Sequence, residues 1–257
     1  MEELNQLKYF FFDLDKTLWN WDDTIIGAED LIDSLKQSER QVFFHTDNTL
    51  LTRQEYARKL TSIGINAEKD QILTSGYVAA KHLAERNINN VYTLGESGLM
   101  DELEAQDIQV TEDSKTVVAG FDRQFNYNKL KRAAKILQNG GELLVCSNEK
   151  SFRTSKGEQP HQGPTNKALE QFSEAKLLGK PSPEFRNEFK SYFDYIVGKS
   201  AFIGDRLEDI ETGNRLGMTT IAVMSGEITE EKLKEADEMQ KPEYGLSSLH
   251  KLRRRVL

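Results

Sequence analysis

The sequence predicts an α/β fold built on an open parallel sheet, and three observations support this fold class. Short apolar runs alternate with amphipathic helical patterns at both ends of the chain. The first run, residues 9–12, is continuously apolar, as in a strand that is covered on both faces. Polar segments that could carry chemistry begin where three of the runs stop, which is where such a sheet places its binding crevice.

The first part of the chain is expected to form strand, helix, strand and helix in that order. Residues 9–12 and 42–44 are the two strands. Between them, apolar residues recur along one side of an expected helix, at Ile25, Ile26, Leu31, Ile32 and Leu35. Thr52 and Glu55 form a capping-box pattern, so a second helix is expected from there to about Leu60, before Gly64.

The middle of the chain predicts a second α/β block. Its expected strands are 91–94, 116–121 and 142–146. Its expected helices lie around 78–85, 97–104, 127–137 and 166–172. The polar stretch 148–164 contains glycine and proline and is expected to be a long loop.

The end of the chain returns to the alternation seen at the beginning. Helices are expected from Ser182 or Pro183 to 193, over 207–216, from about Thr229, and from Leu249 onward. Strands are expected at 200–203, 219–224 and 243–246. The simplest interpretation is a core domain made of residues 1–74 and 176–257, with residues 75–175 inserted as an α/β cap domain.

Composition agrees with a soluble enzyme but does not by itself identify one. The 257 residues are 37% hydrophobic and 30% charged, and the formal net charge of −8 disfavours nucleic-acid binding. Cys146 is the only cysteine, so no intrachain disulfide forms and a reducing cytoplasm is expected. No apolar stretch approaches the ~20 residues of a membrane span, and no leader pattern is present, so no membrane partner is expected.

Four polar islands carry the candidate chemistry: 13–17, 45–48, 179–183 and 204–209. Asp13 and Asp15 stand two residues apart at the end of the first strand. This pair allows a division of labour, with Asp13 attacking phosphorus and Asp15 acting as general acid and then as general base.

An anionic nucleophile approaches an anionic phosphate only where positive charge and N–H groups offset the repulsion. Lys180 can supply the charge and Thr46 a hydroxyl. Backbone N–H groups around Leu14, Asp15 and Asp47 complete the expected phosphate cradle.

Asp205 and Asp209 lie at positions i and i+4, one turn apart if a helix begins there. Hard oxygen ligands suit Mg²⁺ better than Zn²⁺. We expect Asp13 and Asp205 to be direct metal ligands, with the backbone carbonyl of Asp15 as a third. Asp209 is assigned to the outer part of this metal site, and Glu208 competes with it for that role.

With these four islands in order, the chain resembles the haloacid dehalogenase superfamily over nearly its whole length. It is most similar to the NagD-like and 4-nitrophenylphosphatase branch (subfamily IIA), on the stretches 46–48, 52–56, 120–127 and 204–207. The resemblance implies a Rossmann-like core with a large inserted α/β cap (C2-type). It also implies a Mg²⁺-dependent phosphatase that passes through an aspartyl-phosphate on Asp13.

Three features depart from the family pattern. Lys16 stands where the first motif usually has glycine, so it either points outward or tunes the preference for substrate charge. Asp47 replaces a residue that is usually asparagine, and the spacing between the aspartates of the fourth island is one residue short. Substrate choice is expected to lie in the cap, where Asp122, Arg123 and Asn148 are candidate contacts, and the cap could also support a homo-oligomer.

Other functions remain open on the residues alone. A phosphotransferase or mutase would use the same aspartyl-phosphate but exclude water. A non-catalytic phosphate-binding protein could also display two acids, a hydroxyl and a lysine. Asp15 argues against carbon–halogen hydrolysis, because a halide leaving group needs no acid.

Overall fold

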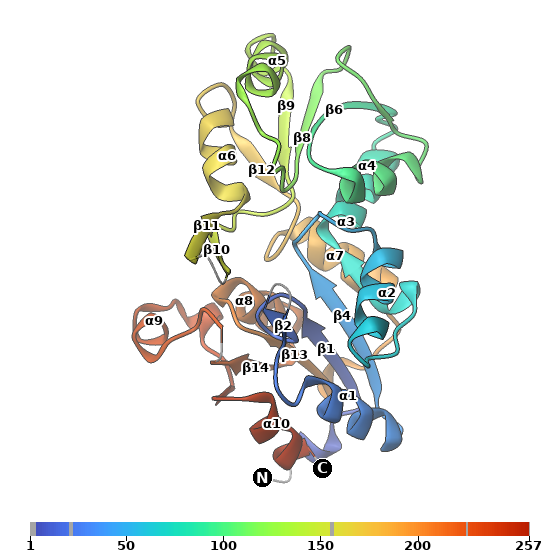
Figure 1. Ribbon diagram of the computed structural model, residues 1–257, viewed down its shortest axis with the longest axis vertical. Helices are drawn as coiled ribbons and strands as arrows, with labels where there is room; N and C mark the ends of the chain where they lie inside the picture. The colour runs from blue at the N-terminus through green and yellow to red at the C-terminus, as the bar shows by residue number, and fades with distance from the viewer. Residues whose placement is uncertain (1–3, 21–22, 155–156, 225, 257) are drawn as a thin grey trace. The chain divides into compact units, whose positions relative to one another are not determined.

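Two parallel sheets organise the chain, which confirms the predicted α/β fold class (Figure 1). The computed structural model describes residues 4–20, 23–154, 157–224 and 226–256. Contacts divide the chain into two units. Unit 1 holds Met1–Thr46, Ala57–Ile72 and Lys190–Leu257, and unit 2 holds Asp47–Tyr56 and Leu73–Phe189. The domain boundaries at 74/75 and 175/176 stay a prediction.

The sheet of the core has the strand order β15-β14-β13-β1-β4-β5. Its strands are β1 (Tyr9–Asp13), β4 (Gln41–Thr46), β5 (Ile72–Thr74), β13 (Ser200–Gly204), β14 (Thr219–Val223) and β15 (Tyr244–Leu246). The central strand β1 runs parallel to β4 on one side and to β13 on the other. Phe10, Phe11 and Phe12 are fully buried, which explains why this strand is continuously apolar.

Helices α1 (Ala28–Gln37), α8 (Leu207–Leu216), α9 (Glu230–Glu235) and α10 (Leu249–Val256) belong to unit 1, like most of this sheet. Helix α2 (Arg53–Ser62) has residues in both units, and most of α7 (Pro183–Tyr192) belongs to unit 2. Helix α8 packs on β13 and β14, and α1 packs on β4 and α10. The predicted capping box of α2 is confirmed, because Thr52 N–H donates to Glu55 and Glu55 N–H donates to the Thr52 hydroxyl.

The second sheet has the parallel order β12-β9-β8-β6-β7. Its strands are β6 (Asn90–Leu94), β7 (Gln109–Val110), β8 (Thr116–Ala119), β9 (Glu142–Val145) and β12 (Ala175–Leu177). Its helices are α3 (Ser75–Glu85), α4 (Ser97–Glu104), α5 (Tyr127–Gln138) and α6 (Gln162–Leu169).

Each face of the second sheet has its own apolar core (Figure 1). Helices α3 and α4 pack on the face that carries Val118 and Leu144. Helices α5 and α6 pack on the face that carries Val117 and Leu143. Successive residues of a strand therefore enter opposite cores, as the two-residue period of a strand requires.

The prediction of a long loop over 148–164 is wrong. It contains an antiparallel hairpin, β10 (Ser151–Thr154) with β11 (Gly157–Pro160), followed by the start of α6. All four residues of β11 are exposed, so no apolar pattern marks it in the sequence. A second small hairpin, β2 (Trp19–Asn20) with β3 (Asp23–Thr24), follows the end of β1. Among the described residues, no helix combines the length and the apolar character that crossing a bilayer requires.

Candidate active site

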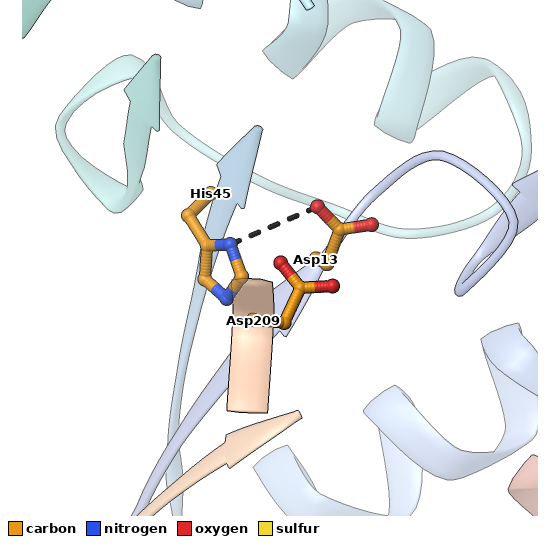
Figure 2. Close-up of side chains that lie close together, drawn as sticks. All are labelled: Asp13, His45 and Asp209. Atoms are coloured by element: carbon orange, nitrogen blue, oxygen red, sulfur yellow. Dashed lines mark ion pairs between the residues drawn. The ribbon is translucent and has the colours of Figure 1, made fainter. Parts of the chain in front are cut away.

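Asp13 is the last residue of β1, and its buried carboxylate meets two other side chains (Figure 2). One ligand atom from each of Asp13, His45 and Asp209 lies within 4.8 Å of the other two. The Nδ1 of His45 is 3.8 Å from Oδ1 of Asp13. Strand β1, strand β4 and helix α8 thus each direct one polar side chain to the same point.

The strand register explains the position of His45. His45 is the partner of Asp13 across the β1–β4 pair, so both side chains leave the sheet on the same side. Its imidazole stacks on the ring of Phe202, with 4.1 Å between the centroids. No role was predicted for His45, because only the strand register places it opposite Asp13.

Asp15 is held by two hydrogen-bond donors. The indole Nε1–H of Trp19 donates to Oδ1 of Asp15 at 2.9 Å, and the hydroxyl of Thr46 donates to Oδ2 at 3.3 Å. Thr46 was predicted as a phosphate contact, and in the structure its hydroxyl contacts Asp15. Trp19 is buried, and Lys59 lies over its ring at 4.2 Å, which helps to fix the indole.

A tight turn carries the chain from Asp13 to Trp19. The carbonyl of Leu14 accepts from the backbone N–H groups of Leu18 at 2.9 Å and of Thr17 and Trp19 at 3.3 Å. Lys16 N–H donates to the Trp19 carbonyl at 2.6 Å. Lys16 adopts a φ of 62°, in the left-handed region that favours glycine.

The fourth island follows β13 and opens α8. Asp205 and Asp209 are fully buried. Asp205 Oδ2 accepts from Glu227 N–H at 2.9 Å, and Asp209 Oδ2 accepts from Arg206 N–H at 3.1 Å at the start of the helix. The side chain of Glu208 is 41% exposed and pairs with Arg206, so Asp209 is the acid that faces Asp13.

Burial is the largest cause and the neighbouring Asp209 carboxylate the second of a net rise in the pKa of Asp205 to about 8. The Glu227 N–H, the Lys16 ammonium and the Arg206 guanidinium act in the opposite direction. These three groups therefore offset only part of the cost of charging Asp205.

The donor set of unit 1 fits a divalent cation. Carboxylates of Asp13 and Asp209 converge with one imidazole, and Asp205 is buried in the same unit. Carboxylate oxygens suit Mg²⁺, while an imidazole nitrogen suits transition metals as well. A bound cation would offset both the repulsion between these acids and the cost of burying them.

Asp47 and Lys180 belong to unit 2. Lys180 is 2% exposed, and its backbone N–H donates to Asp47 Oδ1 at 3.1 Å. Asp47 is tied to the start of α3, because its carbonyl accepts from the Ser75 hydroxyl at 2.9 Å. Gly179 permits this arrangement, since a Cβ there would lie 2.0 Å from the Cys146 carbonyl oxygen.

The three candidate substrate residues in unit 2 all make contacts within that unit. Asp122 accepts from Lys129 at 2.6 Å, and Arg123 pairs with Glu96 at 2.6 Å. Asn148 is exposed, and its Oδ1 accepts from the Asn166 amide at 2.9 Å. Their role in substrate binding stays a prediction.

The structure thus brings together the predicted residues in two groups. Unit 1 gathers Asp13, Asp15, Thr46, Asp205 and Asp209, and unit 2 joins Asp47 to Lys180. A common site for both groups stays a prediction, as do the phosphate contacts of the Leu14 and Asp15 N–H groups. Sequence reasoning missed His45 and Glu227. It pointed to Trp19 as a residue that could gate the cleft or pack, but not as a donor to Asp15, which lies four residues before it.

Comparison with known proteins adds a consistent set of relatives. A model described as haloacid dehalogenase-like hydrolase matches residues 10–109, and a HAD-hydrolase-like model matches residues 177–252. Chronophin of Bos taurus is 30% identical over 84% of this chain and 80% of its own length. An acid sugar phosphatase of Staphylococcus saprophyticus is 29% identical over 90% and 91%. The crystal structure of a 4-nitrophenylphosphatase from Thermotoga maritima superposes with a TM-score of 0.89, at 29% identity and 99% coverage of both chains.

Proposed function

This chain belongs to the haloacid dehalogenase-like hydrolases and is a phosphatase of that family, and we propose that it hydrolyses a small phosphate monoester with Mg²⁺ through a phosphorylated Asp13. The observation that carries the proposal is the arrangement at the end of β1. There, a buried Asp13 precedes an Asp15 that two donors hold in place. The two carboxylates are therefore positioned for different tasks.

In the first step, a carboxylate oxygen of Asp13 forms a bond to phosphorus while the ester P–O bond breaks. Asp15 gives its proton to the leaving oxygen, which departs as an alcohol or phenol. The hydrogen bonds from Trp19 and Thr46 fix the direction in which the Asp15 carboxyl points.

In the second step, Asp15 takes a proton from a water molecule whose oxygen bonds to the phosphorus. The bond between Asp13 and phosphorus breaks, and inorganic phosphate is released. Both carboxyl groups return to their starting protonation states, so the cycle balances.

Asp13, Asp205, Asp209 and the Asp15 carbonyl are the groups that we propose to hold Mg²⁺, with His45 beside them. When bound, the ion supplies positive charge that stabilises the phosphoryl group during transfer. Lys180 and the N–H groups near Leu14, Asp15 and Asp47 stay predicted phosphate contacts. Lys180 and Asp47 lie together in unit 2, where the Lys180 backbone N–H donates to Asp47 Oδ1 at 3.1 Å, which supports a shared role for these two residues.

Substitution of the two aspartates tests the mechanism, with 4-nitrophenyl phosphate and Mg²⁺ in a steady-state assay. Asp15→Asn is expected to lower kcat by about 10²–10⁴-fold, the usual contribution of a general acid–base group. Asp13→Asn is expected to abolish turnover, and mass spectrometry of acid-quenched wild-type protein should find the phosphoryl group on Asp13.

Asp23→Asn is the matched control, because this substitution makes the same chemical change at an exposed position of β3. It should retain wild-type activity, and all three variants should keep the far-UV circular dichroism of the wild type. Normal turnover in Asp13→Asn would defeat the assignment of the nucleophile. Release of phosphate only when a second alcohol is present would instead favour a phosphotransferase.

The substrate is proposed as a small phosphorylated metabolite, and the acid sugar phosphatase among the relatives makes sugar phosphates the first class to test. The panel should also contain nucleotides and glycolate-sized phosphates. We further propose a cytoplasmic enzyme that binds neither nucleic acid nor membrane, and a homo-oligomer through the cap, which sedimentation would test.

A further inference from the structure

Lys16 combines an unfavourable backbone conformation with a largely buried side chain. Its φ of 62° lies in the left-handed region, which glycine adopts freely and residues with a Cβ adopt rarely. Its side chain is only 14% exposed. The expectation that Lys16 either points outward or meets the substrate is therefore incomplete, because the structure gives its ammonium a partner within unit 1.

That partner is Glu227, in the segment between β14 and α9. The Nζ of Lys16 lies 2.5 Å from Oε1 of Glu227, which makes a short charge-assisted hydrogen bond. Lys232 of α9 approaches the other carboxylate oxygen of Glu227 at 3.8 Å. The contact thus joins the turn that follows the nucleophile to a segment 211 positions away in sequence.

The same segment wraps Asp205. Glu227 N–H donates to Asp205 Oδ2 at 2.9 Å, and Ile228 N–H donates to the Asp205 carbonyl at 2.9 Å. A Cβ at Gly226 would lie 2.0 Å from Asp205 Oδ2, so the backbone there touches the carboxylate. From the other side, the Thr17 hydroxyl lies 3.5 Å from Asp205 Oδ1.

We propose that Lys16 and Glu227 are positioning residues whose ion pair tethers the nucleophile turn to residues 226–228 and so holds the Asp205 carboxylate in place for the divalent ion. The inference rests on the proposed function, because it assigns Asp205 to a Mg²⁺ site. It adds two residues that touch neither substrate nor ion and act through Asp205.

Lys16→Gly gives the decisive test, because two explanations predict opposite signs. If Lys16 acts only through its charge, its removal lowers the local positive potential and Mg²⁺ binds more tightly. If the tether positions Asp205, Mg²⁺ binds about tenfold more weakly. This is the lower end of the loss in metal affinity that usually follows removal of a group that orients a metal ligand. Isothermal titration of the metal-free protein with Mg²⁺ measures this without any turnover.

Three further variants test whether Lys16 and Glu227 act on Mg²⁺ binding as one ion pair. Lys16→Arg keeps the cation and should restore most of the Mg²⁺ affinity. Glu227→Gln keeps the N–H that binds Asp205 but loses the ion pair, so it should also weaken Mg²⁺ binding. Because the two side chains act as one unit, the double variant Lys16→Gly with Glu227→Gln should bind Mg²⁺ no more weakly than the weaker single variant.

Arg215→Gln is the matched control. It removes another ion pair of unit 1, with Glu211 on the surface of α8, and should leave Mg²⁺ affinity unchanged. Unchanged or tighter Mg²⁺ binding in Lys16→Gly overturns the tether, and so does additive loss in the double variant or a wild type that binds no Mg²⁺. A wild type that binds Mg²⁺, loses affinity in Lys16→Gly and hydrolyses no phosphate ester overturns the proposed function and leaves the tether standing.

Discussion

The orientation of the Asp15 carboxyl depends on the Trp19 indole as well as on the Thr46 hydroxyl. Trp19→Phe keeps a buried ring of similar shape but removes the N–H that donates to Asp15 Oδ1. A hydrogen bond to a charged group is worth about 1.5–3 kcal/mol, so kcat is expected to fall by roughly tenfold or more. Steady-state kinetics with 4-nitrophenyl phosphate should show this fall in kcat with little change in KM.

Lys59→Met is the control for this prediction. Lys59 lies over the indole ring, so its replacement tests whether a change in the packing around Trp19 is enough to lower kcat. A wild-type kcat in Trp19→Phe would mean that the Thr46 hydroxyl is sufficient to orient Asp15.

Cys146 should be inert in the native protein. It is fully buried after β9, and burial raises the pKa of its thiol well above the usual range, with the Asp47 charge adding to the effect. Since the thiolate is the reactive form, a disulfide reagent at pH 8 should modify Cys146 only after denaturant is added. Absorbance of the released thiolate measures this, and rapid native-state modification would contradict the described burial.

Individual residues were predictable from sequence where an acid follows an apolar run. Asp13 directly follows such a run, and Asp205 follows one after a single glycine; the structure places Asp13 at the end of β1 and Asp205 just after the end of β13. His45 was not predictable, because its contact with Asp13 depends on the register of β1 against β4. Glu227 was not predictable either, since it reaches Lys16 and Asp205 only after β14 has joined the sheet.

At the scale of elements, a buried ion pair joins the start of α2 to α4. Arg53 donates through Nε and Nη2 to both carboxylate oxygens of Glu102, and its backbone N–H donates as well. Its guanidinium also lies 3.5 Å from the centroid of Tyr77. Glu102→Gln removes the carboxylate that binds this buried arginine through both oxygens and is expected to lower the free energy of unfolding by about 3–5 kcal/mol.

Glu96→Gln is the matched control in the same unit. It makes the same chemical change to a pair whose arginine, Arg123, has a half-exposed side chain. Exposed pairs contribute about 0–1 kcal/mol, so denaturant unfolding should separate the two variants clearly. Equal effects of both substitutions would show that burial does not govern the strength of the Arg53–Glu102 pair.

Helices were predicted better than short strands, for a physical reason. The segments 97–104 and 207–216 match α4 and α8 because amphipathic spacing and end signals mark them, including Gly217 at the end of α8. The three-residue strands β5 and β12 are too short to show a period. The hairpin β10–β11 escaped because its second strand buries no side chain.

At the scale of the whole molecule, the sequence predicted an insertion but not the order of the strands. Absence of the four islands from the middle block indicated that the two ends fold together. The strand order required knowledge of which strand pairs with β1, and nothing in the apolar runs distinguishes β13 from β14 as its neighbour. The insertion itself stays a prediction.

The position of β1 between β4 and β13 has a consequence for biosynthesis. As the chain leaves the ribosome, β1 can pair with β4 at once, but its other edge waits for β13, which emerges after the whole of unit 2. Pulse-labelled hydrogen exchange during refolding should therefore protect amides of β8 and β9 before those that link β1 to β13. Simultaneous protection of all four strands would mean that the chain closes its longest connection as early as its shortest.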